Sequence, residues 1–169
     1  DATFYSKEDL VINGSGSLTV TGNYSNGIRS KDDLILISGT YNVTAKNNAI
    51  KGKDSVAIRG GDYTLTTTAG DGIQANNAED AEKGYVAIDG GSFAITSGQD
   101  AIQAETNLSL QNAQMTLQTA AGAGSTNLDT EGSYKGLKAG GALVVASGNY
   151  ELNTADDALH ADDTVAING

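Results

Sequence analysis

The stretch Gly72-Ile73-Gln74-Ala75 returns as Ala101-Ile102-Gln103-Ala104, with a small residue, an aliphatic residue, a polar residue and a second small residue in the same order. The pattern occurs six times along the chain. The other four occurrences are Gly27-Ile28-Arg29-Ser30, Ala49-Ile50-Lys51-Gly52, Gly136-Leu137-Lys138-Ala139 and Ala158-Leu159-His160-Ala161. Recurrence of this kind is typical of repeat architectures, in which each unit buries its apolar face only against its neighbours.

Each occurrence opens a unit with three short stretches of alternating apolar and polar residues. The aliphatic residues of successive motifs lie 22, 23, 29, 35 and 22 positions apart, because insertions at 76–84 and 120–135 lengthen the third and fourth intervals. Alternation places one side of each strand inward, so equivalent residues of successive units stack. We therefore predict one all-β domain over residues 1–169. It would be a parallel β-helix of about seven coils, with three short strands in each coil of about 22 residues.

A large residue followed two positions later by an aliphatic residue marks the third strand of most coils. Residues two apart share one face of a strand, so we expect this column to stack inside the core rather than to bind sugars. Its members are Tyr41, Tyr63, Phe93, Met115 and Tyr150. Tyr85 and Tyr134 lie off the column, at the ends of the two insertions. They are the aromatic residues that we expect to stack on a sugar ring.

The composition argues against several classes of function. The formal net charge is −11, with 21 Asp and Glu against 10 Lys and Arg, so we expect no nucleic acid and no membrane as a partner. The absence of Cys and the presence of one His argue against thiolate metal sites, cysteine catalysis and multi-histidine zinc sites. An acidic surface favours metal cations or neutral and extracellular ligands instead.

The polar residue of each motif belongs to a column on the first strand of successive coils. This column contains Arg29, Lys51, Gln74, Gln103, Lys138 and His160. Gly and Ala flank it, so we predict a flat strip that contacts an extended polysaccharide through Lys51, Gln74, Gln103, Lys138 and His160. The two insertions leave opposite ends of these strands and are expected to wall the strip. Ordinary exposed strand surface is the alternative, since Lys and Gln are common there.

Acidic residues gather around the same strip. Asp71 and Asp100 precede the motif in successive coils, and two carboxylates about 4.8 Å apart repel unless they are protonated or bridged by a cation. Calcium takes about six to eight oxygen ligands, which stacked turns supply. We therefore predict bound calcium, with the candidate ligands Asp71, Asp100, Glu105, Glu79, Asp80, Asp129, Glu131, Asp157 and Asp162. The alternative is solvated turn carboxylates, because Asn and Asp favour turns.

Two kinds of unit carry a resemblance to a known family. They are Asp71-Gly72-Ile73-Gln74-Ala75, Asp100-Ala101-Ile102-Gln103-Ala104 and Asp157-Ala158-Leu159-His160-Ala161, together with Gly60-Gly61-Asp62-Tyr63-Thr64-Leu65-Thr66 and Gly90-Gly91-Ser92-Phe93-Ala94-Ile95-Thr96. These runs resemble secreted bacterial carbohydrate-binding β-helix proteins that are related in fold to polysaccharide lyases. The resemblance implies a right-handed parallel β-helix, bound calcium, and binding to cellulose or to acidic sugars such as polygalacturonate. It also implies an extracellular location, free or at the cell surface.

A non-catalytic, calcium-binding carbohydrate-binding module is the function that we expect, and two others stay open. A calcium-dependent polysaccharide lyase would use Lys51 or Lys138 as its base, with the acidic residues holding the metal. Against a lyase, the two arginines, Arg29 and Arg59, fall outside the walled region, so we expect no second cation beside these lysines. A structural adhesin or fibre is the third function. No capping helix is expected at either end, so the chain is either part of a longer solenoid or associates end to end with other copies.

Overall fold

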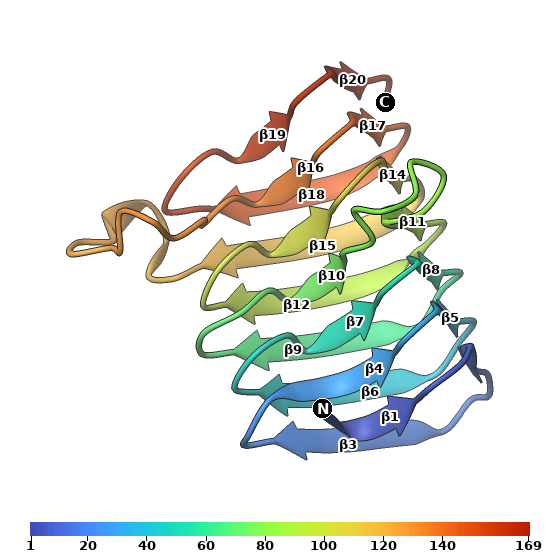
Figure 1. Ribbon diagram of the computed structural model, residues 1–169. Coiled ribbons are helices and arrows are strands. Elements are labelled where there is room, and N and C mark those ends of the chain that lie inside the picture. The colour runs from blue at the N-terminus through green and yellow to red at the C-terminus, as the bar shows by residue number, and fades with distance from the viewer.

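The computed structural model describes all 169 residues as a stack of coils, in which three parallel sheets run the length of the molecule (Figure 1). Six coils each contribute one strand to every sheet and the last coil contributes to two sheets, so hydrogen-bonded neighbours are three strands apart in chain order. The chain starts at one end of the stack and finishes at the other (Figure 1). This is the parallel β-helix that the repeat predicts.

Sheet A contains β1 (Ala2–Ser6), β4 (Asn26–Ser30), β7 (Ile50–Gly52), β10 (Ile73–Ala75), β13 (Ile102–Ala104), β16 (Leu137–Ala139) and β19 (Leu159–Ala161). Sheet B contains β2 (Leu10–Ile12), β5 (Asp33–Leu36), β8 (Ser55–Ile58), β11 (Tyr85–Ile88), β14 (Leu108–Leu110), β17 (Ala142–Val145) and β20 (Thr164–Ile167). Sheet C contains β3 (Ser17–Gly22), β6 (Thr40–Ala45), β9 (Asp62–Thr67), β12 (Gly91–Ser97), β15 (Ala113–Thr119) and β18 (Gly148–Asn153). The helical content is one 3-10 turn, η1 (Gly122–Gly124), and none of it is long and apolar enough to cross a membrane.

The register of sheet A reproduces the repeat residue by residue. Ile50 pairs with Ile28 on one side and with Ile73 on the other, and Ile102 and Leu137 continue the same inward column. All five side chains are fully buried. The insertions fall between strands, so they lengthen two coils without moving any apolar residue to the outer face.

The large residues of sheet C form the stacked core column that the spacing predicts. The rings of Tyr41 and Tyr63 lie 4.8 Å apart, and those of Tyr63 and Phe93 lie 4.6 Å apart with planes only 5° from parallel. Met115 is buried in the same column and Tyr150 is half-buried. The hydroxyl of Tyr63 donates to the carbonyl oxygen of Gly60 at 2.8 Å, so the polar end of the ring is satisfied inside the core.

The two insertions leave sheet A at opposite ends, and Figure 1 shows their loops on opposite sides of the stack. The first follows β10 and is fixed to Asp54. The carboxylate of Asp54 accepts a hydrogen bond from Asn77 Nδ2 at 2.6 Å and pairs with Lys83 Nζ at 2.8 Å. The bond from Lys83 is the main reason that the pKa of Asp54 lies below its usual value. The second insertion contains η1 and ends on Asp100, whose carboxylate accepts a hydrogen bond from Ser133 Oγ at 2.8 Å.

The outermost strands of the three sheets are β1, β2 and β3 at one end of the stack and β18, β19 and β20 at the other. Association of copies through these strands stays a prediction, and a mass measurement in solution tests it.

Candidate functional site

The outer face of sheet A brings together the polar residues that we expect to contact a polysaccharide. Strand pairing places Lys51 beside Gln74, Gln74 beside Gln103, Gln103 beside Lys138, and Lys138 beside His160. All five side chains are half-buried, because each packs between its neighbours in the adjacent coils. The strip predicted from the repeat is therefore one continuous row of side chains.

Sheet A also extends this strip toward its N-terminal end. Arg29 pairs with Lys51, and Tyr5 pairs with Arg29, so both belong to the same outward row. Our expectation that no second cation lies beside the candidate lysines is therefore wrong for Lys51. Tyr5 is a member of this row that we did not expect to contact a sugar. Its position could have been predicted because residues 6–10 recur as residues 30–34, and aligning those two stretches sets Tyr5 opposite Arg29.

Hydrogen bonds to carboxylates occupy most of the polar groups on the strip. Gln74 Nε2 donates to Asp71 Oδ2 at 2.6 Å, and Lys138 Nζ lies 3.4 Å from Asp100 Oδ2. The other contacts are Gln103 Nε2 with Glu105 Oε2 at 3.5 Å, and His160 with Asp157 Oδ2 at 3.2 Å and with Asp162 Oδ1 at 3.1 Å. Arg29 and Lys51 differ from the rest, since neither side chain takes part in a hydrogen bond or an ion pair.

A ladder of Asn and Asp side chains lies beside the strip, at the turns that precede the sheet A strands of successive coils. Asn26 Oδ1 accepts a hydrogen bond from the backbone N–H of Asn48, and Asn48 Oδ1 accepts one from the N–H of Asp71 at 2.8 Å. Asp71 Oδ1 accepts from the N–H of Asp100 at 3.0 Å, and Asp100 Oδ1 accepts from the N–H of Lys135 at 2.7 Å. Each side chain thus satisfies a backbone donor of the next coil that would otherwise be buried without a partner.

The ladder carries an electrostatic conflict at its two carboxylates. Asp71 is 3% exposed and Asp100 is 2% exposed. Burial raises the pKa of Asp71 to about 7, and the negative charge of Asp100 adds to the increase. Asp100 is better compensated, because Ser133, the N–H of Lys135 and the ammonium group of Lys138 all face its carboxylate. If Asp71 is only a turn residue, its hydrogen bond to the backbone of the next coil is explained. Its negative charge is not explained, because Asp71 has no ion-pair partner.

The other candidate metal ligands lie in separate places. Glu79 pairs with Lys53 at 3.2 Å, and Asp80 Oδ1 accepts from the N–H of Glu82 at 3.0 Å. The remaining residues divide between the second insertion, with Asp129 and Glu131, and the last coil, with Asp157 and Asp162 on either side of His160. No three carboxylate or histidine groups of the chain converge on one point. The pair Asp71 and Asp100 is thus the part of the predicted calcium set whose charge most needs a cation.

The two tyrosines expected to stack on a sugar do not join the strip in the same way. Tyr85 begins β11 and pairs with Ser55, so it belongs to sheet B, where it is 37% exposed. Tyr134 is half-buried and its hydroxyl end lies against Gly132 of the second insertion. Tyr5, at 41% exposed, is the aromatic side chain that lies in the row itself.

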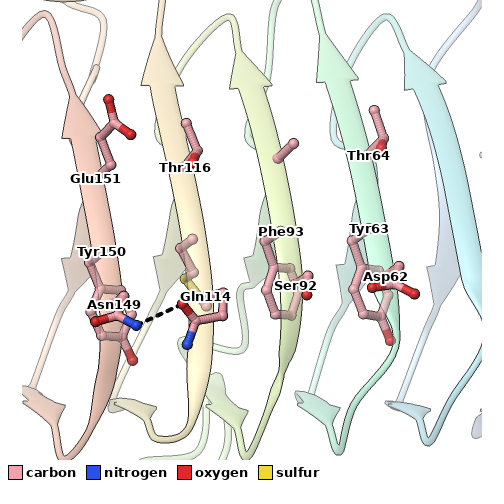
Figure 2. A pocket seen from close by; sticks show the side chains of 12 residues that line it. Asp62, Tyr63, Thr64, Ser92, Phe93, Gln114, Thr116, Asn149, Tyr150 and Glu151 are labelled. Carbon is pink, nitrogen blue, oxygen red and sulfur yellow. Dashed lines mark hydrogen bonds between the residues drawn. The ribbon is translucent and has the colours of Figure 1, made fainter.

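A second surface, which we did not expect from the sequence, is a groove of about 510 Å³ on the outer face of sheet C (Figure 2). Figure 2 shows two rows of outward side chains across β9, β12, β15 and β18, and within one of these rows Asn149 Nδ2 donates to Gln114 Oε1 at 2.8 Å. The rows consist of Asp62, Ser92, Gln114 and Asn149, and of Thr64, Ala94, Thr116 and Glu151. No Lys or Arg lines the groove. The sequence signal for this groove is the polar residues at alternate positions of the third strand of each coil.

Three comparisons with known proteins agree with this geometry. A family model described as "Carbohydrate-binding domain-containing protein" matches residues 1–169. A curated protein of Acetivibrio thermocellus with the same description is 38% identical over 115 residues, which cover 68% of this chain and 40% of that protein. The solved structure of a polysaccharide lyase-like protein from C. thermocellum, a gadolinium derivative, superposes with a TM-score of 0.68 at 31% identity over 98% of this chain and 52% of that one. The chain thus spans about half or less of each of these relatives. With its whole length matched, the chain belongs to the family of carbohydrate-binding domain-containing proteins.

Proposed function

We propose that this domain binds an acidic polysaccharide along the outer face of sheet A, outside the cell, and does not cleave it. The observation that carries the proposal is the continuous outward row from Tyr5 to His160, with its cations and amides in register. Successive side chains are spaced by about 4.8 Å, a distance similar to the repeat of a pyranose chain. Amides and cations are suitable donors to sugar hydroxyls and uronate carboxylates. The two insertions border the row at opposite ends of its strands, where loops often set specificity.

The groove on sheet C suits a different polymer. Its polar lining consists of hydroxyl groups, carboxamides and the carboxylates of Asp62 and Glu151, without a cation. Such a lining would repel a uronate and would donate to and accept from the hydroxyl groups of a neutral glucan. We therefore place a neutral polysaccharide such as cellulose on this face, as a second ligand of the same binding module.

Calcium is part of the proposal at Asp71 and Asp100. Two observations support a fit: Asp71 has no ion-pair partner, and the carboxamide oxygen of Gln103, which neighbours Gln74 in the strip, is buried without a hydrogen-bond donor. Calcium binds carboxylate and carboxamide oxygens and completes its shell with water. The gadolinium derivative of the solved relative is consistent with this, since lanthanide ions share the preference of calcium for oxygen ligands.

Calcium should stabilise the fold if it binds there. At a concentration of about one hundred times its Kd, calcium raises the free energy of unfolding by about 2.7 kcal/mol. Thermal melts in calcium and in chelator measure the shift, and Asp71→Asn should abolish most of it. Asp62→Asn, which alters an exposed carboxylate in the sheet C groove, is the matched control and should retain the shift. Equal midpoints for the wild-type protein in both buffers, with no calcium found by elemental analysis, would exclude the metal.

Retention on gelled polygalacturonate and on insoluble cellulose should depend on different faces, the first on sheet A and the second on sheet C. Lys51→Gln should weaken retention on polygalacturonate and spare cellulose, whereas Gln114→Ala should do the reverse. Retention on polygalacturonate should also fall as salt rises, because contacts between charges at the surface are screened. Loss of both ligands in either variant, when melts show it to be folded, would contradict the assignment of one ligand class to each face.

A polysaccharide lyase is the second candidate, and the position of Lys51 favours it. Burial, followed by the charge of Arg29, lowers the pKa of Lys51, and a base with a neighbouring cation is what proton removal beside a uronate carboxylate requires. We expect no product in an ultraviolet assay for 4,5-unsaturated sugar ends run beside the retention experiment. Steady product formation that Lys51→Ala abolishes would replace the binding module with a lyase.

A further inference from the structure

Arg29 and Lys51 are two adjacent cations of the strip that form no ion pair, although the more distant carboxylate of Asp71 acts on Lys51. They pair directly across β4 and β7, and both side chains are half-buried. Five other basic side chains of the chain form ion pairs with carboxylates, including Lys138 on the same strip. Neither Arg29 nor Lys51 does so. The Nε atom of Arg29 is also fully buried and has no hydrogen-bond partner.

This arrangement is electrostatically incomplete. Two like charges repel when they are carried by paired residues of neighbouring strands, whose backbones lie about 4.8 Å apart. Burial, with the charge of Arg29 second, lowers the pKa of Lys51, and the charge of Asp71 offsets this decrease only in part. The guanidinium group of Arg29 cannot relieve the repulsion by losing its proton. A buried donor without an acceptor is rare in folded proteins and normally indicates a missing partner.

The neighbours of this pair limit what that partner is. On one side Gln74 is already committed, because its Nε2 donates to Asp71 and its Oε1 accepts from Asn48 Nδ2 at 3.1 Å. On the other side Tyr5 lies in register with Arg29 and is 41% exposed. An anion on the outer face therefore meets two free cations, with an aromatic ring at its border.

We propose that Arg29 and Lys51 form an oxyanion subsite that binds the carboxylate or sulfate group of an acidic sugar, with Tyr5 flanking the sugar ring. The inference rests on the proposed function, because it assigns one subsite to the binding face on sheet A. The guanidinium group presents donors in a fork that matches two oxygens of one anion. Lys51 adds a second positive charge from the next coil. Tyr5 provides a face for the apolar side of the pyranose ring.

The subsite can be tested by calorimetric titration with three oligosaccharides: a galacturonate trimer, a sulfated neutral trimer and the unmodified neutral trimer. The wild-type protein should bind one or both acidic trimers and should bind the neutral trimer at least about tenfold more weakly, since charge-assisted hydrogen bonds are lost. Which of the two acidic trimers binds identifies whether a uronate or a sulfated sugar supplies the oxyanion.

Variants separate this subsite from the rest of the face. Arg29→Gln and Lys51→Gln should each weaken binding of the acidic trimer by about tenfold or more. Arg29→Lys keeps the charge but loses the fork, so its affinity should fall between those of Arg29→Gln and the wild type. Lys46→Gln removes an exposed cation outside the strip and should leave the affinity unchanged. In the ¹⁵N spectrum, the Nε–H resonance of Arg29 should move when the trimer is added. That measurement needs no variant to fold.

The outcomes distinguish the subsite from the proposed function. Unchanged affinity in folded Arg29→Gln and Lys51→Gln, with the acidic trimer still bound, would overturn the subsite and leave acid-sugar binding elsewhere on sheet A. Equal binding of neutral and acidic trimers by the wild-type protein would also overturn it. If the wild-type protein binds neither acidic trimer nor gelled polygalacturonate, the proposed function fails and the subsite fails with it.

Discussion

Replacing Phe93 by Ala should lower the free energy of unfolding by about 3–5 kcal/mol, the usual cost of truncating a buried aromatic residue. Phe93 is 4% exposed and stacks 4.6 Å from Tyr63 in the core column of sheet C. Removal of its ring leaves a cavity that backbone hydrogen bonds on both sides keep from closing, because β12 pairs with β9 and with β15. Denaturant unfolding followed by circular dichroism measures the loss.

Ser92→Ala is the matched control on the same strand. Ser92 points outward into the groove, so its truncation should change the free energy of unfolding by no more than about 0.5 kcal/mol. The control also tests the orientation of the strand. A Phe93→Ala protein of normal stability that has lost only its affinity for polysaccharide would contradict the placement of this column in the core.

Asp71→Asn should stabilise the protein at alkaline pH, relative to the wild type and in the presence of chelator. The folded-state pKa of Asp71 is raised from 3.8 to about 7, so between these pH values the folded protein holds a proton that the unfolded chain has released. The free energy of unfolding of the wild type therefore decreases as the pH rises through this window, by about 4 kcal/mol from this carboxyl group alone. Asn does not ionise, so the variant escapes that decrease.

The ladder itself shows that Asn is accommodated at this position. Asn26 and Asn48 fill the equivalent places in earlier coils and accept the same backbone hydrogen bond. Asn48 Nδ2 also donates to Gln74 Oε1, and the corresponding acceptor one coil later is Gln103 Oε1, which has no partner in the wild-type protein. An Asn at position 71 gains that acceptor and gives up the bond from Gln74 to a carboxylate.

Urea unfolding from pH 4 to pH 8 tests this expectation. The stability difference between Asp71→Asn and the wild type should move in favour of the variant by about 4 kcal/mol across that range. Asp62→Asn makes the same change in net charge at an exposed position and should show no such trend. A difference that stays constant with pH would mean that Asp71 is ionised in the folded protein throughout the range.

The sequence alone determined the architecture. The residues Ile28, Ile50 and Ile73 recur 22 and 23 positions apart, and the intervals to Ile102 and Leu137 are longer only because the two insertions fall there; in a solenoid such recurrence requires equivalent coils stacked in register. The inward column of sheet A, the stacked rings of sheet C and the placement of both insertions all follow from this requirement. The outward row of sheet A could be predicted for the same reason, because residues beside a buried column in the repeat must themselves form a column.

Only the tertiary structure decided which hydrogen-bond and ion-pair partners the polar side chains of those columns have. Whether Asp71 binds a cation, water or a backbone N–H depends on which groups the next coil places within about 3 Å, and a spacing of residues does not contain that information. The same holds for Lys138, which is neutralised by Asp100, and for Arg29 and Lys51, which are not. The groove on sheet C arises from the shape of four adjacent strands, and shape is a property of the folded surface rather than of any motif.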